Sequence, residues 1–163
     1  MSRVIVGVGD SAHGLHAMVW AIAEARRLGA ELHAVRTWRD RASASSPVFG
    51  LYRPMLQAAA ACQLHDAFDG AAGGLPAGLH VALVVEEGSA AQVLASYASR
   101  DGDLLVVGQS RRRWRVLPGG TVKGCLRNAQ CPVVVVPASQ LARPMKRLMR
   151  GLRRDISELE SVS

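Results

Sequence analysis

At 163 residues the chain has room for one compact domain, which excludes a nucleotide-binding domain followed by a separate substrate domain. Hydrophobic residues make up 49% of the sequence and charged residues 20%, which excludes disorder over most of its length. The net charge of +7 is concentrated in residues 111–115 and 143–154, and such basic clusters either bind phosphates, nucleic acid or acidic membrane, or face the solvent.

Five short apolar runs, rich in β-branched residues, recur along the chain and have the length of β-strands. They lack the polar alternation of a half-exposed strand, which favours strands buried on both faces of a parallel sheet. The five runs occupy residues 4–8, 31–37, 80–85, 104–107 and 132–136.

Helical patterns separate these five runs. The first helix is expected after Ser11, which suits an N-cap, and before Gly29, which suits a helix C-terminus. Pro54 suits the first turn of a second helix, because the amide that proline lacks would have no partner there. Ser89 can cap a third helix, and Thr121 can cap a short fourth one.

The alternation of strands and helices predicts an α/β fold, with an open doubly wound sheet of five parallel strands flanked by helices. Crossovers between parallel strands are right-handed, which limits the arrangements that such a chain can adopt. In Rossmann-like sheets of this kind, ligands bind outside the carboxyl ends of the strands, where the strand order reverses. The loops at that edge are therefore where functional residues are expected.

The stretch after the last strand differs from the domain that precedes it. We divide the chain into a domain over residues 1–137 and an extension over residues 138–163. Apolar residues of the extension recur at helical spacing from Met145 to Leu159, opposite a basic face. This pattern predicts an amphipathic helix that packs on its own domain or on a dimer partner, with attachment to a membrane surface or to nucleic acid as alternatives.

Targeting, catalytic and metal-binding signatures are missing from the sequence. No apolar run reaches the roughly 18 to 20 residues of a membrane span, and the opening MSRVIVGVGD does not look like a secretory signal, so we expect a cytoplasmic protein. The motifs GxSxG, GxxxxGK(S/T) and HExxH do not occur, and we expect no enzymatic activity. Cys62, Cys125 and Cys131 form no CxxC pair, which predicts reduced, mostly buried thiols and no metal site.

The first turn partly fits a dinucleotide-binding fingerprint. Gly7, Gly9 and Ala12 match GxGxxA, in which glycines let backbone amides approach a pyrophosphate. However, Gly7 lies inside the apolar run, and the second strand ends with Arg36 in place of an acidic ribose ligand. A nicotinamide-dependent oxidoreductase is therefore an alternative that both the motif and the chain length disfavour.

Two glycine-containing points flank the arginine-rich segment between the last two predicted strands. Gly108 ends the fourth strand, and the run from Gly119 to Thr121 begins the last helix. We expect both points at the carboxyl edge of the sheet, where free amides at a helix N-terminus attract an anion such as a triphosphate. The alternative is that these glycines only form tight turns.

Segments along the whole domain resemble the universal stress protein family. They are the opening VIVGVGDS with AMVWAIAEARRLGAELHAVRTW, the stretch VEEGSAAQVLASYA before DGDLLVVGQS, and the ending GGTVKGCLRNAQCPVVVVP. The resemblance runs from Val4 to about Pro137 and implies an adenine nucleotide alpha hydrolase-like fold. It also implies a homodimer that pairs the last strands, here Val133–Val136, and a protein that acts in stress response or dormancy by binding.

In one branch of this family, an ATP site at the carboxyl edge has an adenine side and a phosphate side. Carried over residue by residue, the adenine side falls on Gly9, Asp10, Ser11 and Val35, and the phosphate side on Gly108, Gly120, Thr121 and Val122. Arg111 stands where the family has a glycine, and its guanidinium group can bind phosphate oxygens in place of backbone amides. The resemblance implies ATP as the cofactor, with AMP or ADP as alternatives.

Two hypotheses from different classes follow. In the first, a dimeric stress-response protein binds ATP or a related adenine nucleotide through an altered phosphate loop. In the second, the chain binds no nucleotide and is an interaction module, which recognises an unidentified protein partner through its dimer surface and its basic C-terminal helix.

Overall fold

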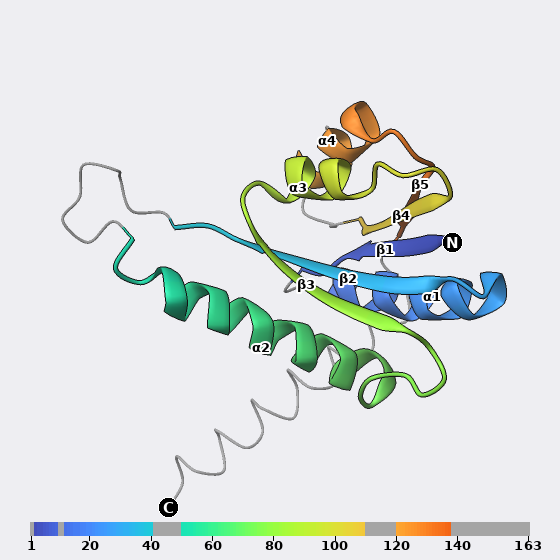
Figure 1. Cartoon of the computed structure of the whole chain (residues 1–163), viewed down its shortest axis with the longest axis horizontal. Helices are drawn as coiled ribbons and strands as arrows, with labels where there is room; N and C mark the ends of the chain where they lie inside the picture. Colours follow the sequence, from blue (N-terminus) through green and yellow to red (C-terminus); the bar gives the residue numbers. More distant parts are fainter. Residues whose placement is uncertain (1, 10–11, 41–49, 110–119, 138–163) are drawn as a thin grey trace, which may run out of the picture.

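The computed structural model describes residues 2–9, 12–40, 50–109 and 120–137 (Figure 1). The predicted site residues Asp10, Ser11 and Arg111, and the C-terminal extension over residues 138–163, lie outside the described residues. Within the described part of the chain, no helix combines the length and the hydrophobicity that a membrane crossing requires.

The described residues form one parallel sheet in the strand order β3-β2-β1-β4-β5. The strands are β1 (Arg3–Gly7), β2 (Glu31–Trp38), β3 (Val81–Glu87), β4 (Asp103–Gly108) and β5 (Val133–Val136). The helices are α1 (Ala12–Leu28), α2 (Arg53–Ala72), α3 (Ala90–Tyr97) and α4 (Gly120–Asn128). This arrangement confirms the open doubly wound α/β fold.

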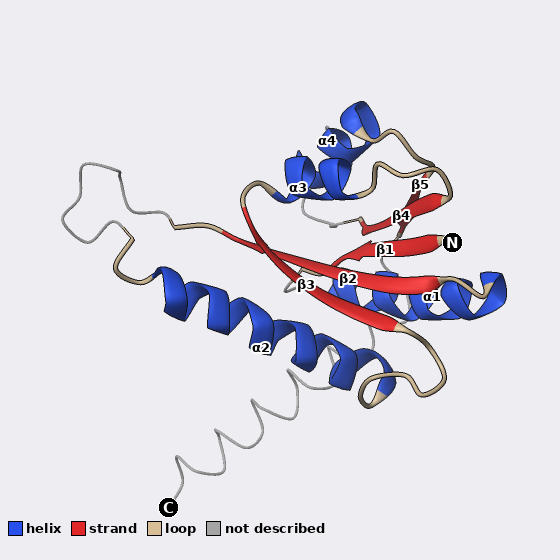
Figure 2. Ribbon diagram, viewed as in Figure 1, coloured by secondary structure: helices blue, strands red, loops and turns tan. Residues whose placement is uncertain are grey.

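The sheet lies between two helical layers. Figure 2 shows α1 and α2 on one face of the sheet and α3 and α4 on the other, and the buried side chains form two matching clusters. The strand order reverses after β3, so the connection through α3 to β4 passes over the opposite face. The resulting switch point lies between β1 and β4, because α1 and α4 leave these strands on opposite faces.

The central strands β1 and β4 are buried on both faces, as their uninterrupted apolar sequences predict. Val4 and Val6 pack toward α1 and α2, whereas Ile5 and Leu105 pack toward α3 and α4. The edge strand β3 departs from the prediction, since Leu83 is 36% exposed. The reason is position: β3 lies at the end of the strand order, where its side chains have fewer neighbours.

The helix boundaries follow the predicted signals with one correction. Gly29 follows α1 with a φ of 60°, a left-handed conformation that glycine adopts without strain. Pro54 lies in the first turn of α2, and Ser89 precedes α3 in an extended conformation. The prediction that Thr121 caps the fourth helix is wrong, because α4 already begins at Gly120 and so includes Thr121 in its first turn.

A buried ion pair closes the amino edge of the sheet. Arg3 begins β1 and Asp103 begins β4, and the register of the two strands places them side by side. The Arg3 guanidinium donates to both carboxylate oxygens of Asp103, at 2.9 and 2.6 Å, and to the carbonyl of Tyr97 at 3.3 Å. The Arg100 amide donates to the same carboxylate at 2.9 Å. These hydrogen bonds offset part of the cost of burying both charges.

Candidate functional site

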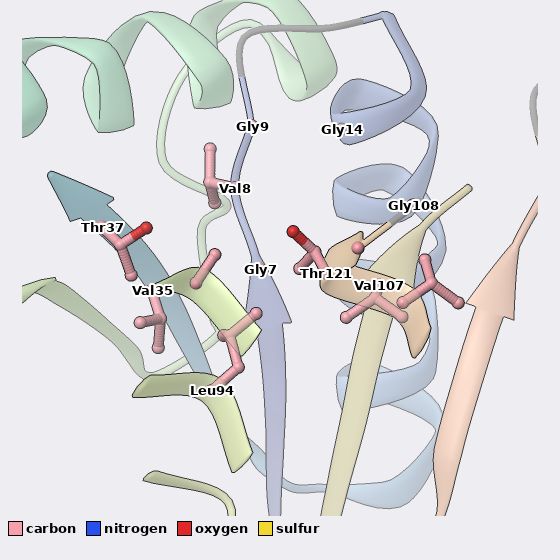
Figure 3. Close-up of a pocket in the computed structure, with 13 residues that line it drawn as sticks. Gly7, Val8, Gly9, Gly14, Val35, Thr37, Leu94, Val107, Gly108 and Thr121 are labelled. Atoms are coloured by element: carbon pink, nitrogen blue, oxygen red, sulfur yellow. The ribbon is translucent and has the colours of Figure 1, made fainter. Parts of the chain in front are cut away.

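A cavity of about 310 Å³ opens at the carboxyl edge of the sheet, beside the switch point between β1 and β4 (Figure 3). Its volume lies at the lower end of the range of small-molecule sites, which begins at roughly 300 Å³. Residues at the ends of the three central strands line it together with residues of α1, α3 and α4. They are Gly7, Val8, Gly9, Gly14, Val35, Thr37, Ala90, Leu94, Val107, Gly108, Gly120, Thr121 and Val122.

One wall of the cavity is apolar. The side chains of Val8, Val35 and Leu94 line it, and those of Val35 and Leu94 are almost fully buried (Figure 3). Leu94 packs directly against β1, since a Cβ atom added at Gly7 would lie 2.7 Å from the Cδ1 atom of Leu94. The glycine at position 7 therefore allows α3 to approach the strand closely enough for its leucine to form this wall.

The loop after β1 lies directly against α1. A Cβ atom added at Gly14 would lie 2.7 Å from the carbonyl oxygen of Gly9 and 3.2 Å from its nitrogen. Any side chain at position 14 would therefore displace the loop. A glycine that permits close packing between helix and strand is also a component of nucleotide-binding turns in other doubly wound folds.

Another side of the cavity presents backbone amides and a hydroxyl group. Because α4 begins at Gly120, the amides of its first turn have no helical partners and its dipole is positive at this end. Thr121 is exposed in this first turn, and Figure 3 shows its hydroxyl beside the cavity that Gly108 of β4 also lines. A helix start of this kind can bind an anionic group such as phosphate.

The cavity gathers those predicted site residues that fall in the described part of the chain. They are Gly9, Val35, Gly108, Gly120, Thr121 and Val122. Gly108 and Thr121 line the same cavity, at the edge where parallel topology was expected to place them. Asp10, Ser11 and Arg111 lie outside the described residues. The ligand contacts of all these residues stay a prediction.

The sequence analysis did not assign the other lining residues to the site, and Thr37, Ala90 and Leu94 are three of them. Thr37 had a usable signal: alternate residues of a strand share a face, so residue 37 lies on the same side of β2 as Val35. Ala90 and Leu94 had none, because the placement of α3 beside β1 follows from packing between distant segments. Their contribution to the cavity is visible only in the tertiary structure.

Arg36, the basic residue at the end of the second predicted strand, makes hydrogen bonds within the protein and does not line the cavity. Its side chain is buried, donating to the Val8 carbonyl at 3.2 Å and to Oε1 of Gln63 in α2 at 2.7 Å. It therefore supports the start of the first loop from the α2 side of the sheet, while Val35 and Thr37 line the cavity.

The three cysteines have free thiols in different environments. Burial raises the pKa of the Cys125 thiol to about 11 and also raises the pKa of Cys131, so both stay protonated and weakly nucleophilic at neutral pH. Cys62 is exposed on α2, which corrects the expectation that the thiols are mostly buried. Its position opposite the buried stripe of α2 accounts for that exposure. No group of three His, Cys, Asp or Glu side chains suited to a metal occurs within the described residues.

Known proteins resemble this chain in sequence family and in fold. The model of the universal stress protein family matches residues 1–137, whereas no curated protein matches the sequence. Universal stress protein UspA from Lactobacillus plantarum is similar in structure, with a TM-score of 0.67 and 23% sequence identity, over 83% of this chain and 97% of that chain.

Two other similar structures contain ligands. A universal stress protein in complex with cAMP has a TM-score of 0.59 and 22% identity, over 85% of this chain and 98% of that chain. A universal stress protein family protein from Arabidopsis thaliana with AMP bound has a TM-score of 0.55 and 18% identity, over 86% of this chain and 94% of that chain.

Proposed function

The chain belongs to the universal stress protein family, and from this premise we propose that it binds an adenine nucleotide in the cavity at the carboxyl edge of its sheet. One observation carries the proposal: Gly9, Val35 and the start of α4 come from separate segments of the chain and line the same cavity. Two structurally similar proteins contain adenine nucleotides, cAMP in one and AMP in the other, which supports this choice of ligand.

The lining suits the two parts of a nucleotide. A planar base can lie against the apolar wall of Val8, Val35 and Leu94, where it loses contact with water. The phosphate can then accept hydrogen bonds from the first-turn amides of α4 and from the Thr121 hydroxyl. Charge and apolar surface thus lie on the sides of the cavity where such a ligand needs them.

We propose ATP as the nucleotide, with ADP or AMP as alternatives. The support is in the sequence: residues 111–115 hold four arginines between Gly108 and Gly120, and guanidinium groups bind phosphate oxygens well. A longer phosphate chain gains more from these charges than a single phosphate does. Comparing the three nucleotides at equal magnesium concentration distinguishes them.

The proposed role is regulatory binding in the cytoplasm during stress or dormancy, without catalysis. We also propose a homodimer that pairs the last strands of two copies. β5 (Val133–Val136) lies at an end of the described sheet, next to β4 alone. Pairing with a second copy would satisfy the backbone groups along its outer side, which supports this arrangement.

The test is nucleotide binding by the purified full chain. We expect saturating Mg-ATP or AMP to raise the Tm by roughly 5–10 °C and acid extraction to release bound nucleotide. Thr121→Ala should weaken binding through the lost hydroxyl, and Gly120→Val should weaken it further by filling the phosphate position. Among the described atoms, none lies within 4 Å of a Cβ added at Gly120, so this variant should fold.

Arg127→Ala is the matched control, because Arg127 is exposed in the last turn of the same helix and lies away from the cavity. Unchanged Tm with every nucleotide, together with an empty extract, would rule out the proposal. In that case the interaction-module hypothesis gains support, for which the replacement of a family glycine by Arg111 is the favouring observation. Deletion after Pro137 should then weaken partner capture, and full capture by the truncated chain would count against that hypothesis.

A further inference from the structure

Strand β3 has one outer side, because it lies at the end of the strand order and pairs with β2 alone in the described sheet. The Leu32 amide donates to the His80 carbonyl, and the Gly88 amide donates to the Trp38 carbonyl, both at 2.9 Å. Even-numbered residues therefore direct their backbone groups toward β2. Because these directions alternate along a strand, the odd-numbered residues direct theirs outward. They are Val81, Leu83, Val85 and Glu87.

This outer side belongs to an apolar strand. Five apolar residues follow one another from Val81 to Val85, and Leu83 at their centre is 36% exposed. The pairing with β2 advances one residue at a time without a bulge, and β3 contains no proline and no charge before Glu86. Proteins usually protect an exposed edge strand with charges, proline or a bulge. The outer side of β3 is therefore suited to the addition of another strand.

The sequence of β3 is complementary to itself in one antiparallel register. This register places Leu83 opposite Leu83 of a second copy, on a two-fold axis. The other opposing pairs are Val81 with Val85, Ala82 with Val84, and His80 with Glu86. Each apolar side chain then meets an apolar one, and the histidine meets a carboxylate.

The neighbouring registers lack this match. A shift by two residues in one direction places Glu86 opposite Ala82, and a shift in the other direction places His80 opposite Val84. In both cases a polar side chain meets an apolar one. The pattern of side chains therefore favours the register with Leu83 on the axis.

The two polar residues of this register are accessible. The His80 side chain is 85% exposed, and its Nδ1 atom lies 4.0 Å from Oε1 of Glu31. Glu86 is exposed and lines a hollow of about 460 Å³ together with Ser89 and Gln92 at the start of α3. This hollow leaves room for the imidazole of a second copy beside the Glu86 carboxylate.

Large apolar side chains are exposed near both ends of β3. At the carboxyl end, Arg53 of α2 forms an ion pair with Glu87, and three apolar side chains beside it are each at least 50% exposed. They are Leu51, Tyr52 and Met55. Leu75, in the connection that precedes the amino end of β3, is 52% exposed. A two-fold axis through Leu83 brings the amino end of one β3 beside the carboxyl end of the other, so Leu75 approaches this apolar group.

We propose that β3 is a self-association surface, at which two copies of the chain pair their β3 strands antiparallel with Leu83 on the two-fold axis. β5 lies at the other end of the strand order, so this contact is separate from the β5 pairing proposed above. It is also independent of nucleotide binding. Copies that pair through β5 would join through β3 into assemblies larger than a dimer.

The first test is disulfide crosslinking of two full-length variants, Ala82→Cys and Val84→Cys, each with Cys62→Ser to remove the exposed native thiol. The register places these two positions in a non-hydrogen-bonded pair, whose Cα atoms lie about 4.5 Å apart, within the span of a disulfide. We expect mild oxidation to crosslink the mixture of the two variants and neither variant alone. No crosslink in the mixture, or a crosslink of either variant with itself, would overturn the proposal.

The second test removes an outward amide. Val85→Pro, added to both cysteine variants, should reduce the crosslink yield at least about tenfold at a concentration where pairing is incomplete, because each interface loses two hydrogen bonds. No hydrogen bond to β2 is lost, since the Val85 amide points outward. Val85→Ala, the matched control, keeps this amide and should keep most of the yield. Equal yields from folded Val85→Pro and Val85→Ala would refute the pairing, and the first test decides if Val85→Pro does not fold.

The third test exchanges the charges across the interface. Glu86→Lys, added to both cysteine variants, should reduce the crosslink yield by about two- to fivefold, as expected for an exposed pair. Adding His80→Glu to the same chains restores opposite charges and should restore the yield. A further loss in the double variant would contradict the register.

Discussion

The two edges of the sheet end the same central strands in opposite ways. At the amino edge, Arg3 of β1 and Asp103 of β4 form a buried ion pair with two hydrogen bonds. At the carboxyl edge, β1 and β4 end in Gly7 and Gly108 beside an open cavity. The difference teaches that the two ends of these strands are built for different purposes: paired charges close the amino edge, whereas backbone and apolar side chains line an open cavity at the carboxyl edge, where we propose that a ligand binds.

The charges at the amino edge stabilise each other. The hydrogen bond with Asp103 raises the pKa of the Arg3 guanidinium. Burial acts to raise the pKa of the Asp103 carboxyl, but hydrogen bonds from Arg3 and from the Arg100 amide hold this pKa below its ordinary value. Both groups are therefore ionised at neutral pH. At the carboxyl edge, by contrast, the nucleotide that we propose would supply the corresponding polar interactions.

Breaking the ion pair should have the largest effect. Asp103→Ala leaves the Arg3 charge buried without its partner, so we expect the free energy of unfolding to fall by about 3–5 kcal/mol in urea denaturation. The double variant Arg3→Met with Asp103→Leu should recover most of this loss, since a matched apolar pair leaves no buried charge. If the edges are independent, the folded double variant binds nucleotide like the wild type. A large loss of affinity in that variant would break the comparison.

Adding a side chain where α1 contacts the first loop at the carboxyl edge should have the next largest effect. Here we expect nucleotide affinity to fall strongly and stability to fall less than in Asp103→Ala. Gly14→Ala places a Cβ against the Gly9 backbone, so we expect a loss of about 1–3 kcal/mol in stability and at least a tenfold loss of nucleotide affinity. Gly70→Ala in α2 is the matched control, because its Cβ would lie 3.5 Å from Leu15, an ordinary contact. This control should gain up to about 1 kcal/mol from helix propensity. Unchanged affinity in Gly14→Ala would contradict the role of the loop.

Acid should weaken the amino edge selectively. Because the pKa of Asp103 is lower in the folded chain than in the unfolded one, its contribution is complete above the unfolded value of about 3.9 and is lost as the pH falls through that value toward the folded pKa. The stability difference between wild type and Asp103→Asn should therefore shrink below about pH 4 in urea denaturation. A difference that stays constant from pH 7 to pH 3 would contradict this coupling.

Thiol labelling should report the smallest effect, at the carboxyl edge. Cys125 is buried on α4 with a pKa of about 11, whereas Cys62 is exposed on α2, so Cys62 should react first at pH 8. Nucleotide bound at the start of α4 should slow the local opening that exposes Cys125 by about threefold. Cys62 is the internal control and should keep its rate, and equal slowing of both thiols would argue against a local effect.

The strands and the helix limits could be predicted because they depend on local patterns. The run from Val4 to Val8 required burial on both faces, and Gly29 and Pro54 marked helix termini by their backbone preferences. The placement of Gly108 and Thr121 at one edge followed from parallel topology. The start of α4 at Gly120 was less predictable, because a helix terminus depends on backbone hydrogen bonds that side-chain preferences indicate only to within a residue or two.

By itself, the sequence determined the α/β layers of the fold, the edge of the sheet where a cavity was expected, and some of the residues that line this cavity, such as Gly108 and Thr121. Only the tertiary structure decided which atoms meet at the two edges of the sheet. Arg3 meets Asp103, and Gly14 meets Gly9, through packing of one segment on another. Thr37 lines the cavity, in a part of β2 that continues past Gly7, the last residue of β1. Where each strand ends against its neighbours is a property of strand register, and register joins distant segments that no local pattern connects.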